Sequence, residues 1–203
     1  EALRGPLREA RPDLILVAGW ESKIPAPLYS ALPHGGWNIH PSLLPKYRGH
    51  NPYFHALANG EEETGITVHR LTDRLDAGEI LLQDKIPIPA DETMGGLWEK
   101  LAQLGALAAE KTLRLLEDSI ALREMLHPQP PGNYPRAPKI TPADLMLAST
   151  MTIQKARHLI RACNPFYGAV SRIGTRMVKV YEAVRLPDTG LARTASLSGP
   201  VMF

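Results

Sequence analysis

The sequence predicts an α/β protein with a Rossmann-like parallel sheet as its core and a small C-terminal α+β segment. Apolar or β-branched runs alternate with helical periods along residues 11–118, which is the pattern of a layered α/β domain. A proline-rich stretch at 127–144 then precedes a short helix and two short strands. These features predict a core at 1–126, a linker at 127–144 and a separate segment at 145–203.

Composition indicates a globular protein. The 203 residues are 44% hydrophobic and 22% charged, which is enough to bury a sizeable core. No apolar run approaches the length of a membrane span, and the first residues show no signal or transit pattern. The single cysteine, Cys163, excludes an internal disulfide framework and suits a reducing compartment. We therefore expect a soluble, cytoplasmic protein with Cys163 buried as a small hydrophobe.

Charge is unevenly distributed along the chain. The formal net charge is +2, but residues 151–203 hold eight Lys and Arg residues against Glu182 and Asp188. That segment is therefore +6, and residues 1–150 sum to −4. The basic tail suits a phosphate-bearing partner, or it is a solvated basic surface.

The first elements follow a strand, helix, strand pattern. Residues 11–19, RPDLILVAG, form an apolar run between a proline and a glycine and predict a buried strand. Residues 25–32 predict a short helix with proline in its first turn, and residues 37–40 predict the next strand. Such a unit predicts two parallel strands joined by a right-handed crossover.

A loop and a strand pair follow. Prolines and a glycine in residues 41–52 predict a loop without regular structure at the carboxyl edge of the sheet, where open α/β sheets bind ligands. Residues 52–60 predict a helix that begins at a proline and ends before a glycine. The alternating runs at 64–71 and 78–89 predict strands joined by the tight loop TDRLDAG.

The remaining elements are helical with one strand pair. Residues 92–118 have leucines and alanines at three- and four-residue spacings, which predicts a long amphipathic helix against the sheet. The stretch at 127–144 contains six prolines and predicts an ordered strap or linker. Residues 152–163 predict a helix, and VSRIG and RMVKVYEAV after it predict two short strands.

Polar residues at the strand ends predict a catalytic site. Asn38 and His40 alternate on one strand and so project from the same face, and two carboxylates of nearly equal standing, Asp73 and Asp76, lie in the loop between the next two strands. The Asn38 amide and a protonated His40 can donate hydrogen bonds to an oxyanion, while Asp76 orients His40, raises its pKa and helps to take a proton from an amine. The set therefore predicts acyl transfer to an amine.

Other interpretations of these residues have weaker patterns. The histidines form no H-x-x-x-H or H-E-x-x-H spacing, so we expect no metal. Ser42 lacks the G-x-S-x-G elbow of a nucleophile, and no G-x-G-x-x-G or Walker A sequence is present. Lys46 and Arg48 either hold a substrate anion or are solvated loop charges.

The motifs NIHPSLLPKYRG and LDAGEILLQDKIPI resemble the folate-dependent formyltransferases, the family of methionyl-tRNA formyltransferase, amino-sugar formyltransferases and glycinamide ribonucleotide formyltransferase. The resemblance extends over residues 11–186 and includes GITVHRL, PRAPKIT and IRACNPFYGA. It implies that Asn38, His40 and Asp76 are the catalytic residues. It also implies that the first strands of the family fold are missing from this sequence.

The resemblance implies 10-formyltetrahydrofolate as the formyl donor, with its pterin against the backbone of two loops. By resemblance, the donor-binding residues are those at the two loops, Ser22, Lys23, Ile24, Thr72, Asp73 and Asp76. The acceptor is then a primary amine on a nucleotide-linked amino sugar or on methionyl-tRNA, with Lys46 and Arg48 as candidate acceptor-binding residues. Two alternatives stay open, a 10-formyltetrahydrofolate hydrolase and a noncatalytic folate-binding or interaction module. The sequence does not determine the oligomeric state.

Overall fold

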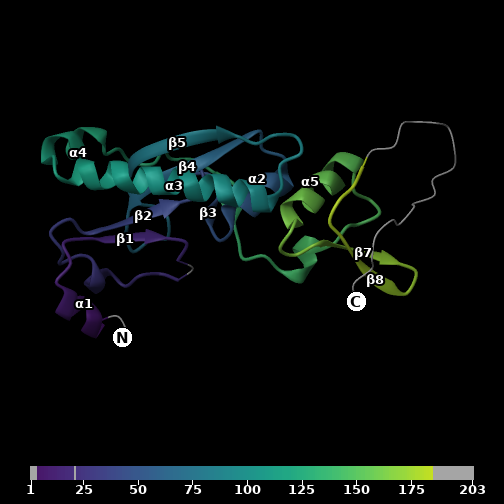
Figure 1. Cartoon of the computed structure of the whole chain (residues 1–203), viewed down its shortest axis with the longest axis horizontal. Coiled ribbons are helices and arrows are strands. Elements are labelled where there is room, and N and C mark those ends of the chain that lie inside the picture. Colours follow the sequence, from purple (N-terminus) through teal and green to yellow (C-terminus); the bar gives the residue numbers. More distant parts are fainter. Residues whose placement is uncertain (1–3, 21, 185–203) are drawn as a thin grey trace.

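A four-stranded sheet forms the centre of the protein, in a computed structural model that describes residues 4–20 and 22–184 (Figure 1). The strands occur in the order β1 (Ile15–Ala18), β2 (Gly36–His40), β4 (Glu63–Arg70) and β5 (Ile80–Pro87). β1 and β2 are parallel, as the crossover pattern predicted. β4 runs antiparallel to both β2 and β5.

The α/β class is confirmed, but the prediction of a parallel sheet is wrong because the sheet is mixed. The loop 71–79 between β4 and β5 is too short for a crossover, which needs a dozen or more residues. The connection from β2 to β4 contains α2 (Pro52–Asn59), which packs mainly against the later helix α5 (Ile153–Cys163) and does not return the chain across the sheet.

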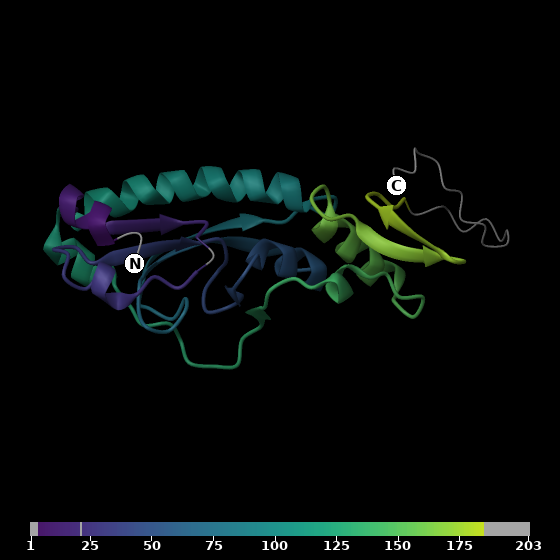
Figure 2. The same ribbon diagram turned by 90° about the horizontal axis from the view of Figure 1, so that it is seen from below.

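Helix α3 (Met94–Leu116) runs along one face of the sheet, as predicted (Figure 2). Thr93 caps its start by accepting a hydrogen bond from Gly96 N. Its apolar stripe buries Leu97 and Leu101, which join a hydrophobic cluster with Ile39 of β2 and Ile66 of β4. This packing holds β2 and β4, which carry the polar residues of the site, in a fixed register.

Two local predictions differ from the structure, and one short helix was not predicted. The helix predicted at 25–32 is a single 3-10 turn, η1 (Ala26–Leu28), closed by hydrogen bonds from Leu28 N to the Pro25 carbonyl oxygen and from Tyr29 N to the Ala26 carbonyl oxygen. The loop 41–52 contains a two-residue strand, β3 (Arg48–Gly49), and a short helix, α4 (Ser119–Met125), follows α3. The helix at 52–60 matches α2, with Gly60 in the left-handed conformation at its end.

The proline-rich stretch 127–144 is an ordered strap along the core. It contains β6 (Arg136–Ala137), which pairs in parallel with β3, and ends in the 3-10 helix η2 (Pro142–Leu145). At its start, His127 and Ile80 exchange two backbone hydrogen bonds of 3.0 and 2.8 Å. The strap therefore contacts the same loops that carry the polar residues of the site.

The C-terminal elements are α5 and the hairpin of β7 (Ala169–Ile173) and β8 (Arg176–Val180), as predicted. Leu159, Ile160 and the fully buried Cys163 belong to the same hydrophobic cluster as the main sheet. The division at 145–203 stays a prediction, and the tail charges at 185–203 lie outside the described residues. No helix in the described ranges has the length and apolar character needed to cross a membrane.

Candidate active site

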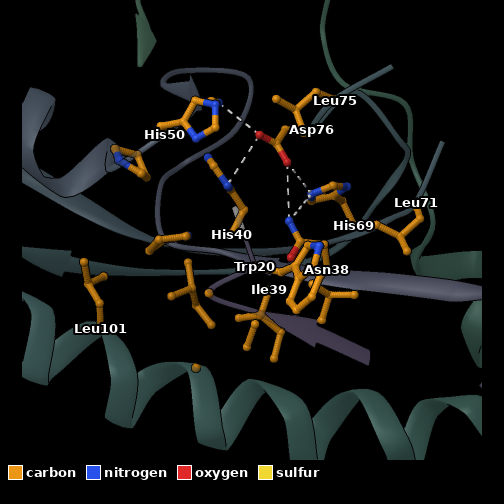
Figure 3. Close-up of a pocket in the computed structure, with 18 of the residues that line it drawn as sticks. Trp20, Asn38, Ile39, His40, His50, His69, Leu71, Leu75, Asp76 and Leu101 are labelled. Atoms are coloured by element: carbon orange, nitrogen blue, oxygen red, sulfur yellow. Dashed lines mark hydrogen bonds and ion pairs between the residues drawn. The ribbon is translucent and has the colours of Figure 1, made fainter. Parts of the chain in front are cut away.

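A cavity of about 660 Å³ opens where the carboxyl ends of β1 and β2 meet the loop 71–79 and helix α3. Its size suits a ligand as large as a drug or cofactor. Apolar residues of β1, β2 and α3 form one side, including Val17, Ile39 and Leu101. At the other side, in Figure 3, Asn38, His40, His69 and Asp76 gather around one another.

The structure brings the three predicted side chains together. Asn38 and His40 extend from the same face of β2, as their alternation predicted (Figure 3). Asn38 Nδ2 donates a hydrogen bond of 3.3 Å to Asp76 Oδ1, and His40 Nδ1 lies 3.7 Å from Asp76 Oδ2. His40 and Asp76 are buried, at 4% and 6% exposure, so their charges act in a poorly hydrated environment.

The position of the Asp76 carboxylate is set by the backbone of the loop 71–79 and by the backbone of Gly49. Asp76 has φ of +51°, in the left-handed region that aspartate tolerates better than most residues. The backbone N–H of Gly49 donates a hydrogen bond of 2.9 Å to Asp76 Oδ2. The carboxylate is therefore held between β2, β4 and the loop that carries β3.

Asp76 is ionised at neutral pH. Burial acts to raise the pKa of its carboxyl group, but the hydrogen bond with His69, the charges of His40 and His69 and the Gly49 amide outweigh burial and lower that pKa. The site thus contains one fixed negative charge.

Asp76 acts to raise the pKa of His40, as expected, but the net pKa of this residue is lowered. Burial lowers the pKa of His40 below the ordinary value and outweighs the raising effects of Asp76 and of the hydrogen bond to Tyr47. His40 Nε2 lies 2.9 Å from the carbonyl oxygen of Tyr47, which can only accept, so Nε2 carries a proton. In neutral His40 the Nδ1 lone pair is therefore left beside Asp76, ready to accept a proton.

His69 belongs to the cluster, although the sequence analysis gave it no role. It is 1% exposed, and its Nε2 lies 3.5 Å from Asp76 Oδ1 and 3.2 Å from Asn38 Nδ2. Its Nδ1 faces the carbonyl oxygen of Arg70 at 2.9 Å and therefore donates to it. Asn38 and His69 are partners in the β2–β4 register, a pairing that requires knowledge of the sheet.

The predicted donor-binding residues lie around the cavity with one exception. Ser22, Lys23, Ile24 and Thr72 line it together with Asp76. Asp73 is outside the lining, but its carboxylate lies 3.8 Å from Lys23 Nζ. Both side chains are exposed, so this ion pair adds little stability, although it links the two loops at the cavity.

The two predicted acceptor-binding cations lie in different places. Lys46 Nζ is 3.0 Å from Glu61 Oε2 and lines a smaller cavity of about 220 Å³. Arg48 Nε donates a hydrogen bond of 2.9 Å to Gln129 Oε1, in the strap beside the Asp76 loop. The structure therefore brings Arg48, and not Lys46, close to the predicted catalytic residues.

The two weaker interpretations, a Ser42 nucleophile and a metal site, find no supporting arrangement among the described residues. Ser42 donates its hydroxyl hydrogen to the carbonyl oxygen of Lys46 at 2.8 Å and stabilises the loop turn. Across residues 4–20 and 22–184, no group of three His, Cys, Asp or Glu side chains is arranged to hold a metal ion.

Comparison with known proteins assigns the family. The sequence model of the formyl transferase family matches residues 1–112, more than half of the chain. This protein therefore belongs to the formyl transferase family, as the motifs of the sequence indicated.

The relatives include methionyl-tRNA formyltransferases. The enzyme of Kosmotoga olearia is 36% identical over 177 residues, which are 87% of this chain and 56% of that protein. The enzyme of Pseudothermotoga lettingae is 38% identical over 181 residues, 89% of this chain and 58% of that protein. The chain thus spans little more than half the length of these curated relatives.

Solved structures share the fold at low identity. A 4-N formyltransferase from Francisella tularensis superposes with a TM-score of 0.67 at 23% identity, covering 91% of this chain and 74% of that one. HypX from Aquifex aeolicus in complex with tetrahydrofolic acid superposes with a TM-score of 0.71 at 19% identity, covering 88% of this chain and 30% of that one. These likenesses confirm the fold.

Proposed function

We propose that this protein transfers a formyl group from 10-formyltetrahydrofolate to a primary amine, with Asn38, His40 and Asp76 as its catalytic residues. The observation that carries the proposal is the convergence of these three side chains at the polar side of the 660 Å³ cavity. An amide donor, a neutral imidazole and a buried carboxylate supply the groups that acyl transfer to an amine requires.

The reaction forms a bond between the acceptor nitrogen and the formyl carbon and breaks the bond from that carbon to the folate nitrogen. His40 Nδ1 accepts the proton that the amine loses, and the resulting imidazolium is stabilised by Asp76 at 3.7 Å. The same proton then passes to the leaving folate nitrogen. Asn38 turns its N–H from Asp76 Oδ1 to the formyl oxygen as negative charge develops there.

The donor fits the cavity by size and chemistry. Its apolar side accommodates an aromatic ring system, and the backbone of loops 22–24 and 72–76 offers hydrogen-bonding groups to a pterin. The structural neighbour HypX was solved in complex with tetrahydrofolic acid, which supports a folate as the class of ligand. No metal is needed, because the oxyanion is stabilised by protein donors.

The acceptor carries phosphate, as a nucleotide-linked amino sugar or as methionyl-tRNA. Arg48 and Arg136 are partners in the β3–β6 register. Burial lowers the pKa of Arg48 most, and the nearby positive charges of Arg136 and Arg74 lower it further. Within the described ranges none of these guanidinium groups has a carboxylate within 4.0 Å. Guanidinium groups without a carboxylate partner, gathered around Arg48, suit a phosphate. Relatives named as methionyl-tRNA formyltransferases support the tRNA acceptor.

The reaction belongs in a reducing compartment such as the cytoplasm. Cys163 is a free, buried cysteine, and burial raises the pKa of its thiol to about 11. It therefore stays a protonated packing residue and takes no part in transfer.

The test incubates the protein with 10-formyltetrahydrofolate and one of three additions: a nucleoside-diphosphate amino sugar, methionyl-tRNA, or no amine. Tetrahydrofolate release is followed by absorbance, and the formyl product by mass spectrometry. We expect release that depends on an amine and disappears in His40→Ala. Equal release without amine would show a hydrolase, and no release with any addition would show a noncatalytic module. Strong inhibition by salt with methionyl-tRNA alone would select the tRNA.

A further inference from the structure

Gln129, in the strap, makes hydrogen bonds in two directions. Its side-chain oxygen accepts from Arg48 Nε at 2.9 Å and also from an Arg48 terminal nitrogen. Its side-chain nitrogen donates to the carbonyl oxygens of Asp76 and Gly78, each at 2.9 Å. Both halves of the amide are therefore engaged, one with the β3 loop and one with the loop 71–79.

Gln129 contacts the loop 71–79 where the backbone conformation of that loop is unusual. Asp76 has a positive φ, and Gly78 approaches the carbonyl oxygen of Arg70 so closely that a Cβ would lie 1.9 Å from it. Such a loop persists only when surrounding contacts determine it. Gln129 supplies two of these contacts, on either side of Ala77.

The strap itself is anchored close to Gln129. His127 and Ile80 exchange backbone hydrogen bonds, and β6 pairs with β3 further along the strap. Since both ends of this stretch are fixed to the core, the position of Gln129 does not depend on the bonds of its own side chain. Because the strap backbone is fixed, the hydrogen bonds of the Gln129 side chain can hold the two loops in position.

The geometry points to Gln129 as a positioning residue that holds the Asp76 loop in its catalytic conformation and orients Arg48 toward the acceptor. It contacts no reacting atom in this arrangement. It acts through the Asp76 backbone, which sets where the carboxylate meets His40, and through Arg48, whose remaining N–H groups are left for an anion.

The first test is amide hydrogen exchange in Gln129→Met, and it needs no activity. The Gly49 N–H donates a hydrogen bond to Asp76 Oδ2, so the protection of this amide from exchange reports the position of the carboxylate. The Ile80 and His127 amides report whether the strap remains attached. We expect the protection of Gly49 to fall about tenfold or more while that of Ile80 and His127 is retained.

The second test is kinetic and rests on the proposed function. Gln129→Glu keeps an acceptor for Arg48 but places carboxylate oxygens against the Asp76 and Gly78 carbonyls. We expect kcat to fall about 10- to 100-fold with little change in the KM of the acceptor. In Gln129→Met we expect a lower kcat and a higher acceptor KM, whereas Arg48→Met raises that KM with a smaller effect on kcat. The control is Gln103→Met, at an exposed glutamine of α3.

Two results would overturn the inference. Unchanged Gly49 protection in Gln129→Met shows that the loop does not need Gln129. Equal loss of protection at Gly49, Ile80 and His127 shows that Gln129 only attaches the strap. If the unsubstituted protein transfers no formyl group, the proposed function fails, but the exchange measurement still decides the role of Gln129.

Discussion

Asn38 and His69 lie opposite each other in the antiparallel pair of β2 and β4, with Asn38 Nδ2 3.2 Å from His69 Nε2. Because His69 Nδ1 donates to Arg70, its Nε2 is the acceptor in this contact when the ring is neutral. One hydrogen of the Asn38 amide is thus directed to His69 and the other to Asp76. The contact with His69 keeps the Asn38 amide at the site when its other hydrogen leaves Asp76 for the formyl oxygen.

Replacing His69 with glutamine should reduce kcat about tenfold and leave the KM of the donor nearly unchanged, because the substitution loosens Asn38 and Asp76 without removing either. Steady-state kinetics would measure this. The matched control is His34→Gln, at an exposed histidine outside the cluster. An unchanged kcat in the His69 variant would mean that the ring serves only the packing of β4.

Replacing His40 with asparagine should have a larger effect, because it removes the group that accepts the proton of the amine. We expect kcat to fall about 10²- to 10⁴-fold while the affinity for tetrahydrofolate, measured by calorimetry, stays similar. A variant that keeps more than a tenth of the activity would exclude His40 as the base.

The substitution Asp76→Asn keeps the shape of the side chain and removes its charge. Since the Asp76 carboxylate acts to raise the pKa of His40, its loss should move the acidic limb of kcat/KM to lower pH and reduce kcat about 10²-fold. The pH–rate profile measures both effects, with the exposed Asp13→Asn as control. A shift of the limb to higher pH would contradict the assigned coupling.

Acid should destabilise the protein in two steps. Burial lowers the pKa of His40, so below about pH 6.5 the unfolded chain binds a proton that the folded chain does not, and stability falls as the pH falls. The lowered pKa of Asp76 adds a second loss below about pH 3.9. Urea unfolding between pH 5 and 8 should therefore show lower stability at pH 5, by up to about 1.4 kcal/mol per pH unit for each proton. In His40→Asn the slope near pH 6 should be smaller, and an identical slope would assign it to another group.

Gly49→Ala should reduce both stability and activity. Gly49 has φ of +124°, and an added Cβ would lie 2.1 Å from the carbonyl oxygen of Ala137 in β6. The clash separates β3 from β6 and displaces the amide that holds Asp76. We expect a cost of about 2 kcal/mol or more by thermal unfolding, together with a lower kcat. Gly5→Ala, with open space around its Cβ, should be neutral or slightly stabilising.

Much of the fold followed from local sequence patterns. The apolar run before Gly19, the alternation in GITVHRL and the leucine spacing at 92–118 each matched an element, because a strand and an amphipathic helix impose their periods on the residues that they bury. The loops that flank the site could also be predicted, since proline and glycine interrupt regular helices and strands. The antiparallel direction of β4 relative to β2 was missed, because it depends on the path of α2 rather than on any local period.

For the site, the sequence by itself determined which residues of β2 share a face and that Asp76 follows in a loop between two strands. Tertiary structure alone decided that His69 joins the cluster, that Gln129 of the strap donates hydrogen bonds to the Asp76 loop, and that burial lowers the pKa of His40. The register between strands and the burial of a ring are set by residues far apart in the chain. The pKa of His40 depends on the balance between burial, which lowers it, and the Asp76 carboxylate and Tyr47 hydrogen bond, which raise it, and that balance exists only once the chain has folded.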